Sequence, residues 1–220
     1  MKENIEKKDS EKEKNEQNKK IEFQSKITAY IFFGIIVITI ASFLIANNLR
    51  HKENKFVFEG VTFEKKKFGE LTIYEAVKNI ETENGIVPYV LKVKNDPRDM
   101  KEINVSAEIK FRRRVFVSYS SETRGCENIS LAGSTIGSFL GSSGIVVIGA
   151  ASDKDYAEEK NIDYVVCNNS IGDTVIMVDI ANYSTIYQDE TYRDCYHISF
   201  SCENAVKTME RFIIAALFRV

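Results

Sequence analysis

The sequence predicts an α+β fold in which an N-terminal transmembrane helix precedes one domain with a mixed β-sheet covered by about three helices. Three observations lead to this prediction: an uncharged run at 27–46, short alternating segments in the first half of the remaining chain, and alternating helix and strand patterns in its second half. We therefore divide the chain into a charged flexible tail at 1–26, a transmembrane helix at 27–46, a linker at 47–55 and a folded α+β domain at 56–220.

The tail is almost wholly polar, with opposite charges at helical i,i+4 spacing, such as Glu3 and Lys7, and without an apolar stripe. A segment of this composition buries too little apolar surface to fold alone. The whole chain carries 30 basic and 32 acidic residues, for a net charge of −2. Such a balance creates no field that would attract nucleic acid, so we expect no nucleic-acid partner.

The run ITAYIFFGIIVITIASFLIA at 27–46 contains no charged residue, and about 20 helical residues at ~1.5 Å each span the ~30 Å hydrocarbon core. The long acidic segment before it is unlike the short basic start of a signal peptide, which favours an uncleaved anchor with the lipid bilayer as its partner. A second uncharged stretch at 129–152 offers an alternative span, but its serines and the break Gly141-Ser142-Ser143-Gly144 favour a buried helix followed by a strand.

Three features predict the topology: a cytoplasmic N-terminus and an outward-facing domain at the cell membrane. Five lysines lie within 15 residues before the run, and three basic residues lie within 15 residues after it. All four cysteines follow the run, as disulfides of an oxidising compartment would: Cys126, Cys167, Cys195 and Cys202. Four possible glycosylation sites also follow it: Asn104, Asn128, Asn168 and Asn182.

Within the domain, the first half is predicted to form strands at 56–60, 61–68, 71–77, 87–93, 105–111 and 115–121. The second half is predicted to form helices at 129–142, 153–161 and about 203–218, with strands at 145–150, 163–167, 173–179, 184–188 and 195–201. Ser152 is expected to cap the second of these helices. The last helix presents an apolar face of Ala205, Met209, Phe212, Ile213, Ala216 and Leu217.

No set of residues predicts catalysis, a cofactor or a metal site. The glycines at 133, 137 and 141 are spaced by four, unlike a phosphate-binding loop. His197, the domain's only histidine, shares a strand face with Cys195, Ser199 and Ser201, and a lone strand histidine is typically a packing residue. The cysteine spacings include no CxxC pair, which favours disulfides over structural zinc.

The cysteine pairing can be narrowed by geometry. An extended strand would separate Cys195 from Cys202 by roughly 23 Å and place them on opposite faces, whereas a disulfide needs Cα atoms within about 7 Å. The remaining pairings are 126–195 with 167–202, and 126–202 with 167–195. We favour the first, on the expectation that Cys167 and Cys202 each follow a strand and reach the same sheet edge.

The strings FGELTIYEA, VKNDPR, DYAEEKNIDYVVC and CYHISFSCENAVKTMERFI resemble a group of uncharacterised archaeal single-pass membrane-anchored proteins with a cysteine-containing α/β extracytoplasmic domain. The resemblance covers roughly residues 56–216 and does not include the charged tail. It implies an anchor followed by an α/β domain, and it implies no activity.

These observations favour a membrane-anchored binding or assembly module of the cell envelope, whose partner is an envelope protein or a glycan. One alternative is an extracytoplasmic, hydrolase-like enzyme with a site assembled around His197, for which a nearby carboxylate and hydroxyl would be required. A second alternative is a cytoplasm-facing domain with free or metal-bound thiols.

Overall fold

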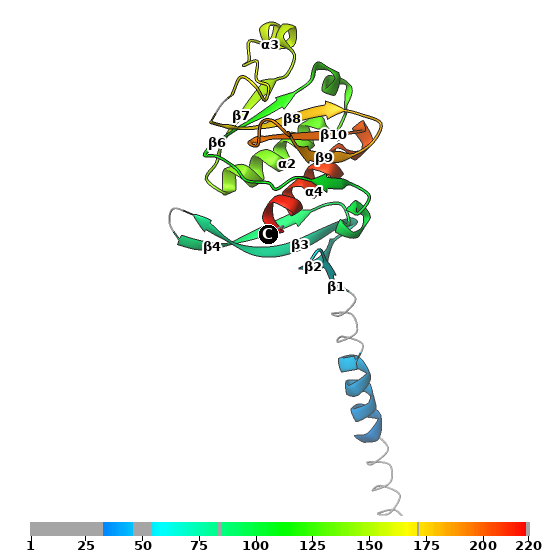
Figure 1. The fold of residues 1–220 in the computed structure, drawn as a ribbon. Helices are drawn as coiled ribbons and strands as arrows, with labels where there is room; N and C mark the ends of the chain where they lie inside the picture. The colour runs from blue at the N-terminus through cyan, green and yellow to red at the C-terminus, as the bar shows by residue number, and fades with distance from the viewer. Residues whose placement is uncertain (1–32, 46–53, 83–84, 171, 219–220) are drawn as a thin grey trace, which may run out of the picture. The chain divides into compact units, whose positions relative to one another are not determined.

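The computed structural model describes residues 33–45, 54–82, 85–170 and 172–218. The chain divides into two compact units, Met1–Asn54 and Lys55–Val220, and all strands described here belong to the second (Figure 1). The predicted tail at 1–26 and most of the predicted linker at 47–55 lie outside the described residues.

The structure contradicts the prediction of a transmembrane helix. The described part of the run is a helix over 33–45, whose Thr39 hydroxyl donates to the Ile35 carbonyl at 2.8 Å. Residues 27–32 and 46 lie outside the described residues. Among the helices that the structure does describe, none combines the length and the apolar character needed to span a membrane.

The second unit begins with an antiparallel meander in which each strand pairs with the next. Its strands are β1 (Lys55–Phe58), β2 (Val61–Phe68), β3 (Leu71–Thr82) and β4 (Gly85–Val93). Gly60 and Gly69, with φ of +80° and +63°, occupy the tight turns after β1 and β2. Along β2 the first residues alternate between buried and exposed, as the sequence pattern predicts for a sheet with one covered face.

The remaining strands form a separate six-stranded sheet, so the prediction of one mixed sheet is wrong. These strands are β5 (Asn104–Ser106), β6 (Arg114–Tyr119), β7 (Val146–Ala151), β8 (Thr174–Ile180), β9 (Thr185–Gln188) and β10 (Cys195–Phe200). The order is β5-β9-β10-β8-β6-β7, with β10, β8, β6 and β7 parallel and β9 antiparallel to β10. The four strands of the meander pair only with one another, and none of them pairs with a strand of this sheet.

Two helices, α2 (Ile129–Ser142) and α4 (Ala205–Phe218), lie between the two sheets, and the main core forms around them (Figure 1). Phe63 and Leu91 from the meander, Ile136 and Phe212 from the helices, and Ile198 from β10 are all buried in this core. The structure also describes short 3₁₀ turns: η1 (Pro97–Met100), η2 (Ser121–Gly125) and η3 (Cys202–Asn204). The predicted apolar face of the last helix packs as expected through Ala205, Met209, Phe212 and Ile213.

The opposite face of the six-stranded sheet carries a smaller apolar cluster beside α3 (Lys154–Lys160) and the segment that follows it. The predicted strand at 163–167 is not formed; only a single bridge joins Tyr164 to Ala151. The Asn169 side chain accounts for this, because it donates to the Tyr164 carbonyl at 3.0 Å and accepts from the Val166 amide at 2.9 Å. The N-cap of α3 is Asp153, one residue after the predicted Ser152.

Candidate functional site

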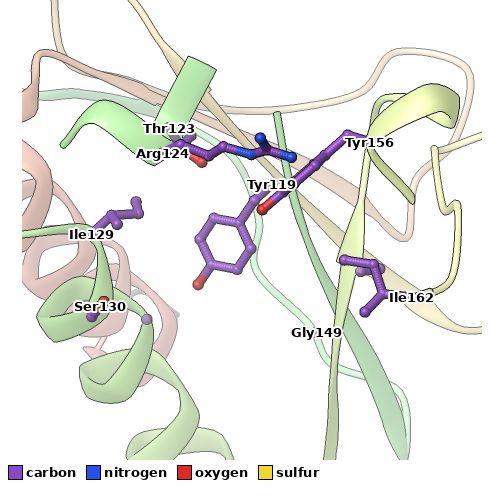
Figure 2. A pocket seen from close by; sticks show the side chains of 10 residues that line it. Tyr119, Thr123, Arg124, Ile129, Ser130, Gly149, Tyr156 and Ile162 are labelled. Carbon is purple, nitrogen blue, oxygen red and sulfur yellow. The ribbon is translucent and has the colours of Figure 1, made fainter. Parts of the chain in front are cut away.

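A cavity of about 360 Å³ lies beside the carboxyl ends of β6 and β7, next to the start of α2 (Figure 2). Ligands of open α/β sheets characteristically bind outside the carboxyl ends of the strands. The cavity is lined by Tyr119, Thr123, Arg124, Ile129, Ser130, Gly133, Gly149, Ala150, Tyr156 and Ile162.

The chain reaches this cavity because β6 ends at Tyr119 and the turn η2 leads directly into α2. The Ser121 amide donates to Asp153 Oδ2 at 2.5 Å, which joins η2 to the residue that precedes α3. Thr123 is fixed in the same turn, since its hydroxyl donates to the Ser120 carbonyl at 2.7 Å. The wall formed by η2 is therefore anchored at its start.

Tyr119 forms the inner wall, and Figure 2 shows its ring in the space between α2 and β7. The hydroxyl lies so close to α2 that a Cβ atom added to Gly133 would be 2.7 Å from Tyr119 Oη. Burial raises the pKa of Tyr119 to about 12. The phenol therefore remains protonated at neutral pH and keeps its capacity to donate a hydrogen bond.

The outer rim of the cavity is polar and close to neutral in charge. The Arg124 guanidinium stacks on the Tyr156 ring, with Cζ 3.8 Å from the ring centroid. Arg124 Nη2 also contacts Glu159 Oε2 at 2.9 Å, and this pairing lowers the pKa of Glu159. Because the guanidinium already has a carboxylate partner, the rim offers a flat surface for stacking more than a free positive charge.

A second group of reactive side chains surrounds His197 on β10. The imidazole stacks on Tyr187, with ring centroids 4.6 Å apart and planes at 5°. Its Nε2 atom lies 3.3 Å from Asp189 Oδ2 and 3.6 Å from Cys167 Sγ. Asp189 accepts the backbone N–H groups of Tyr192 and Thr191, and these bonds hold its pKa below the ordinary range.

Two disulfides are present, as predicted, but the favoured pairing is wrong. Cys126 bonds to Cys202 with Cα atoms 5.0 Å apart, and Cys167 bonds to Cys195 with Cα atoms 5.5 Å apart. Cys167 follows no strand; it precedes β8, which runs parallel to β10 with Val175 opposite Cys195. It therefore meets the amino end of β10, whereas Cys126 and Cys202 lie beyond the carboxyl ends of β6 and β10.

None of the other predicted site residues lines the cavity. The asparagines of all four possible glycosylation sites, Asn104, Asn128, Asn168 and Asn182, are exposed. His197 has the carboxylate that the hydrolase-like alternative requires, in Asp189, but the sulfur of a disulfide occupies the place of a hydroxyl. The cavity lined by Tyr119 does not include His197 among its lining residues.

Sequence analysis did not identify Tyr119, Arg124 and Tyr156, because the pattern at 115–121 indicates only a strand. The available signal was positional: a tyrosine at the end of a parallel strand, followed by a short turn and a helix. Comparisons of the chain with protein-family models, with curated proteins and with solved structures find no match.

Proposed function

We propose that Lys55–Val220 is a binding module of an oxidising compartment outside the cytoplasm, and that the cavity lined by Tyr119 is its binding site. The observation that carries this proposal is the cavity itself: about 360 Å³ of space at the carboxyl edge of a largely parallel sheet. Small-molecule sites are typically concave spaces of ~300–1,000 Å³ with mostly apolar walls and a few polar groups. The cavity therefore suits a compact ligand.

The lining indicates the class of ligand. Ile129, Ala150 and Ile162 supply apolar surface, and the Tyr119 ring supplies a face for stacking. The Arg124 charge is paired with Glu159, so a formally charged group gains little there. An uncharged molecule or side chain with one aromatic ring satisfies these walls, with a polar atom at the rim beside Arg124.

The two disulfides support the proposal of an oxidising compartment. Both bonds close long loops, with sequence separations of 76 and 28 residues, and disulfides of this kind persist mainly in secreted or extracytoplasmic proteins. The four exposed sequon asparagines are compatible with the same compartment. A partner of the envelope would then meet the cavity from outside the cell.

Ligand-observed NMR on the oxidised full-length chain tests the binding site, with indole, phenol and benzamide as probes. We expect at least one probe to bind saturably, and we expect Gly149→Leu to abolish this binding. Gly149 is exposed on β7 and has open space where a side chain would begin, so the new leucine would project into the cavity.

Val146→Leu is the matched control, because it changes an exposed residue of the same strand that does not line the cavity. Its probe binding should equal that of the unmodified chain. Absence of saturable binding by all three probes, or unchanged binding in Gly149→Leu, would contradict the proposed site.

The compartment is tested separately by thiol labelling of intact cells with a membrane-impermeant maleimide. We expect labelling only after treatment with a reductant, since all four cysteines are paired. Labelling without reductant, or labelling that requires cell lysis, would reject an oxidised, outward-facing domain.

A further inference from the structure

The disulfide between Cys167 and Cys195 differs from the other disulfide in what surrounds it. Cys167 Sγ, Cys195 Sγ and a ring nitrogen of His197 all lie within 4.8 Å of one another. In the described part of the chain, this is the group of three ligand-type side chains close enough to hold one metal ion. Cys126 and Cys202 belong to no such group there.

Local structure holds these three residues in place. Cys195 and His197 are two positions apart on β10, so their side chains project from the same face of the sheet. Cys167 comes from the irregular segment before β8 and is bonded to Cys195 across the start of both strands. Tyr187 stacks on the imidazole and fixes its plane, which leaves Nε2 directed at Cys167 and Asp189.

We propose that reduction of the Cys167–Cys195 disulfide creates a zinc site formed by both thiolates and His197. Zinc readily binds two thiolates and one imidazole, whereas magnesium and calcium prefer oxygen ligands. A solvent molecule completes the tetrahedron on the side of Asp189, whose carboxylate accepts its hydrogen bond. The oxidised and zinc-bound states exclude each other because they use the same two sulfur atoms.

A small dithiol can reduce the Cys167–Cys195 disulfide. The dithiol passes two electrons and two protons to the disulfide: the Cys167–Cys195 bond breaks, two thiols form, and the reductant closes into its own disulfide. Zinc then replaces the two thiol protons, which are released to solvent, while neutral His197 donates a nitrogen lone pair. Reoxidation by a disulfide oxidant expels the ion and restores the bond.

The distances require only a small rearrangement. With bonds of about 2.3 Å to sulfur and 2.0–2.1 Å to nitrogen, tetrahedral zinc places its ligand atoms roughly 3.5 Å apart. Cys167 Sγ and His197 Nε2 are already 3.6 Å apart. Two zinc-bound sulfurs lie about 3.75 Å apart, so the two sulfurs must move about 1.7 Å farther apart than in the covalent bond. Cys167 can provide this movement, because it lies in an irregular segment instead of a strand.

A reductant can approach through a second cavity, of about 180 Å³, which is lined by both cysteines and by Gly172, Tyr192 and Asp194 among others. Cys195 is almost fully buried at 1% exposure, while Cys167 is partly exposed. The attacking thiolate of the reductant therefore meets Cys167 first, forms a mixed disulfide with it and releases Cys195. The second thiol of the reductant then attacks the reductant's own sulfur in that mixed disulfide and releases Cys167, so no reagent has to reach the buried Cys195.

The test compares the oxidised and the dithiol-reduced full-length chain after removal of the reductant without oxygen. Only the reduced chain should bind zinc, with one ion per chain by elemental analysis and release of two protons. Cobalt bound in its place should show the intense visible d–d bands of a tetrahedral site and a thiolate charge-transfer band. Zinc should also raise the thermal unfolding temperature of the reduced chain and not of the oxidised chain.

Variants assign the ligands. His197→Ala should remove the tetrahedral cobalt bands, and Asp189→Asn should weaken zinc binding on the order of tenfold, as loss of an outer-shell partner does. The matched control is the double variant Cys126→Ser with Cys202→Ser, which removes the other disulfide and should bind zinc in full. The proposal is overturned if the reduced unmodified chain binds no zinc, or if the cobalt bands persist in His197→Ala. It is equally overturned if Cys126→Ser with Cys202→Ser folds but loses the metal.

Discussion

Arg211 on α4 and Glu59 in the turn after β1 form a two-pronged ion pair across 152 positions of sequence. Its two N–O distances are 2.7 and 2.6 Å, and the Arg211 side chain is 3% exposed. The pair joins the meander to the helix layer at one end of the core. Arg211 also lies over the Phe58 ring, which places the charge against apolar surface.

Glu59→Gln should therefore destabilise the domain, because it leaves the buried guanidinium of Arg211 without an opposite charge. We expect the free energy of unfolding to fall by roughly 2–4 kcal/mol, measured by urea denaturation. Glu108→Gln is the control, since it removes one charge of the exposed Lys110–Glu108 pair and should change nothing measurable. Equal effects of the two substitutions would show that the buried pair is not stabilising.

The buried carboxyl group of Glu210, the neighbour of Arg211, should make the stability of the domain depend on pH. Burial raises the pKa of Glu210 above its ordinary value of 4.5, although its carboxylate accepts hydrogen bonds from the Lys94 amide and from Asn95. Between the ordinary and the raised pKa, the folded chain binds more protons than the unfolded chain. The contribution of Glu210 to stability is thus greatest at low pH and declines as pH rises through this window.

Glu210→Gln should remove that decline, because the amide does not titrate. Urea denaturation in steps from about pH 4 to about pH 8 measures the slope. The variant should also be less stable throughout by about 1–3 kcal/mol, since the amide offers one acceptor oxygen where the carboxylate offers two. Exposed Glu203 supplies a control with the same change of charge. A slope that is the same in Glu210→Gln and Glu203→Gln would contradict the assignment.

Peptide mapping without reduction should yield one linked peptide with Cys126 and Cys202 and another with Cys167 and Cys195. In the chain-entropy model, closing loops of 76 and 28 residues stabilises the fold by about 4.5 and about 3.6 kcal/mol. Replacing Cys126 and Cys202 by serine should thus cost more stability than replacing Cys167 and Cys195. A peptide linking Cys195 to Cys202 would contradict the strand β10.

The sequence allowed several features of this fold to be predicted because they depend on local patterns. Alternation along β10 places His197 and Cys195 on one face, and helical periodicity marks the buried side of α4. The positions of the two disulfides follow from strand order, which is a long-range property. The prediction of a strand at 163–167 places Cys167 at the wrong end of the sheet.

The remaining differences have similar causes. The apolar run Tyr164–Val166 has the composition of a strand, but the Asn169 side chain takes the backbone groups that a ladder would use. The sequence of a single strand also does not show which other strands share its sheet. The prediction of one sheet therefore merges two separate sheets. The cavity residues come from two strands, two helices and the segments between them, and only the assembled fold brings them together.

Gly133 and Tyr119 offer the sharpest test of the cavity wall. Gly133 is within α2, where alanine is usually favoured over glycine by ~1 kcal/mol. At this position the added methyl group would lie 2.7 Å from Tyr119 Oη, closer than unbonded atoms allow, and the partly buried phenol has to move. We therefore expect Gly133→Ala to lower the free energy of unfolding, by about 1–3 kcal/mol as overpacking typically does.

The same substitution should have the opposite effect once the hydroxyl is absent. In a Tyr119→Phe background the nearest ring carbon would be 3.6 Å from the new methyl group, which is an ordinary contact. Gly133→Ala should then be neutral or stabilising by up to ~1 kcal/mol, so the two substitutions should couple by more than 1 kcal/mol in a double-mutant cycle. Gly137→Ala, four residues along the same helix with open space at its Cβ, should stabilise in both backgrounds. Additive effects of Gly133→Ala and Tyr119→Phe would mean that the phenol does not lie against α2, and the cavity would then have a different inner wall.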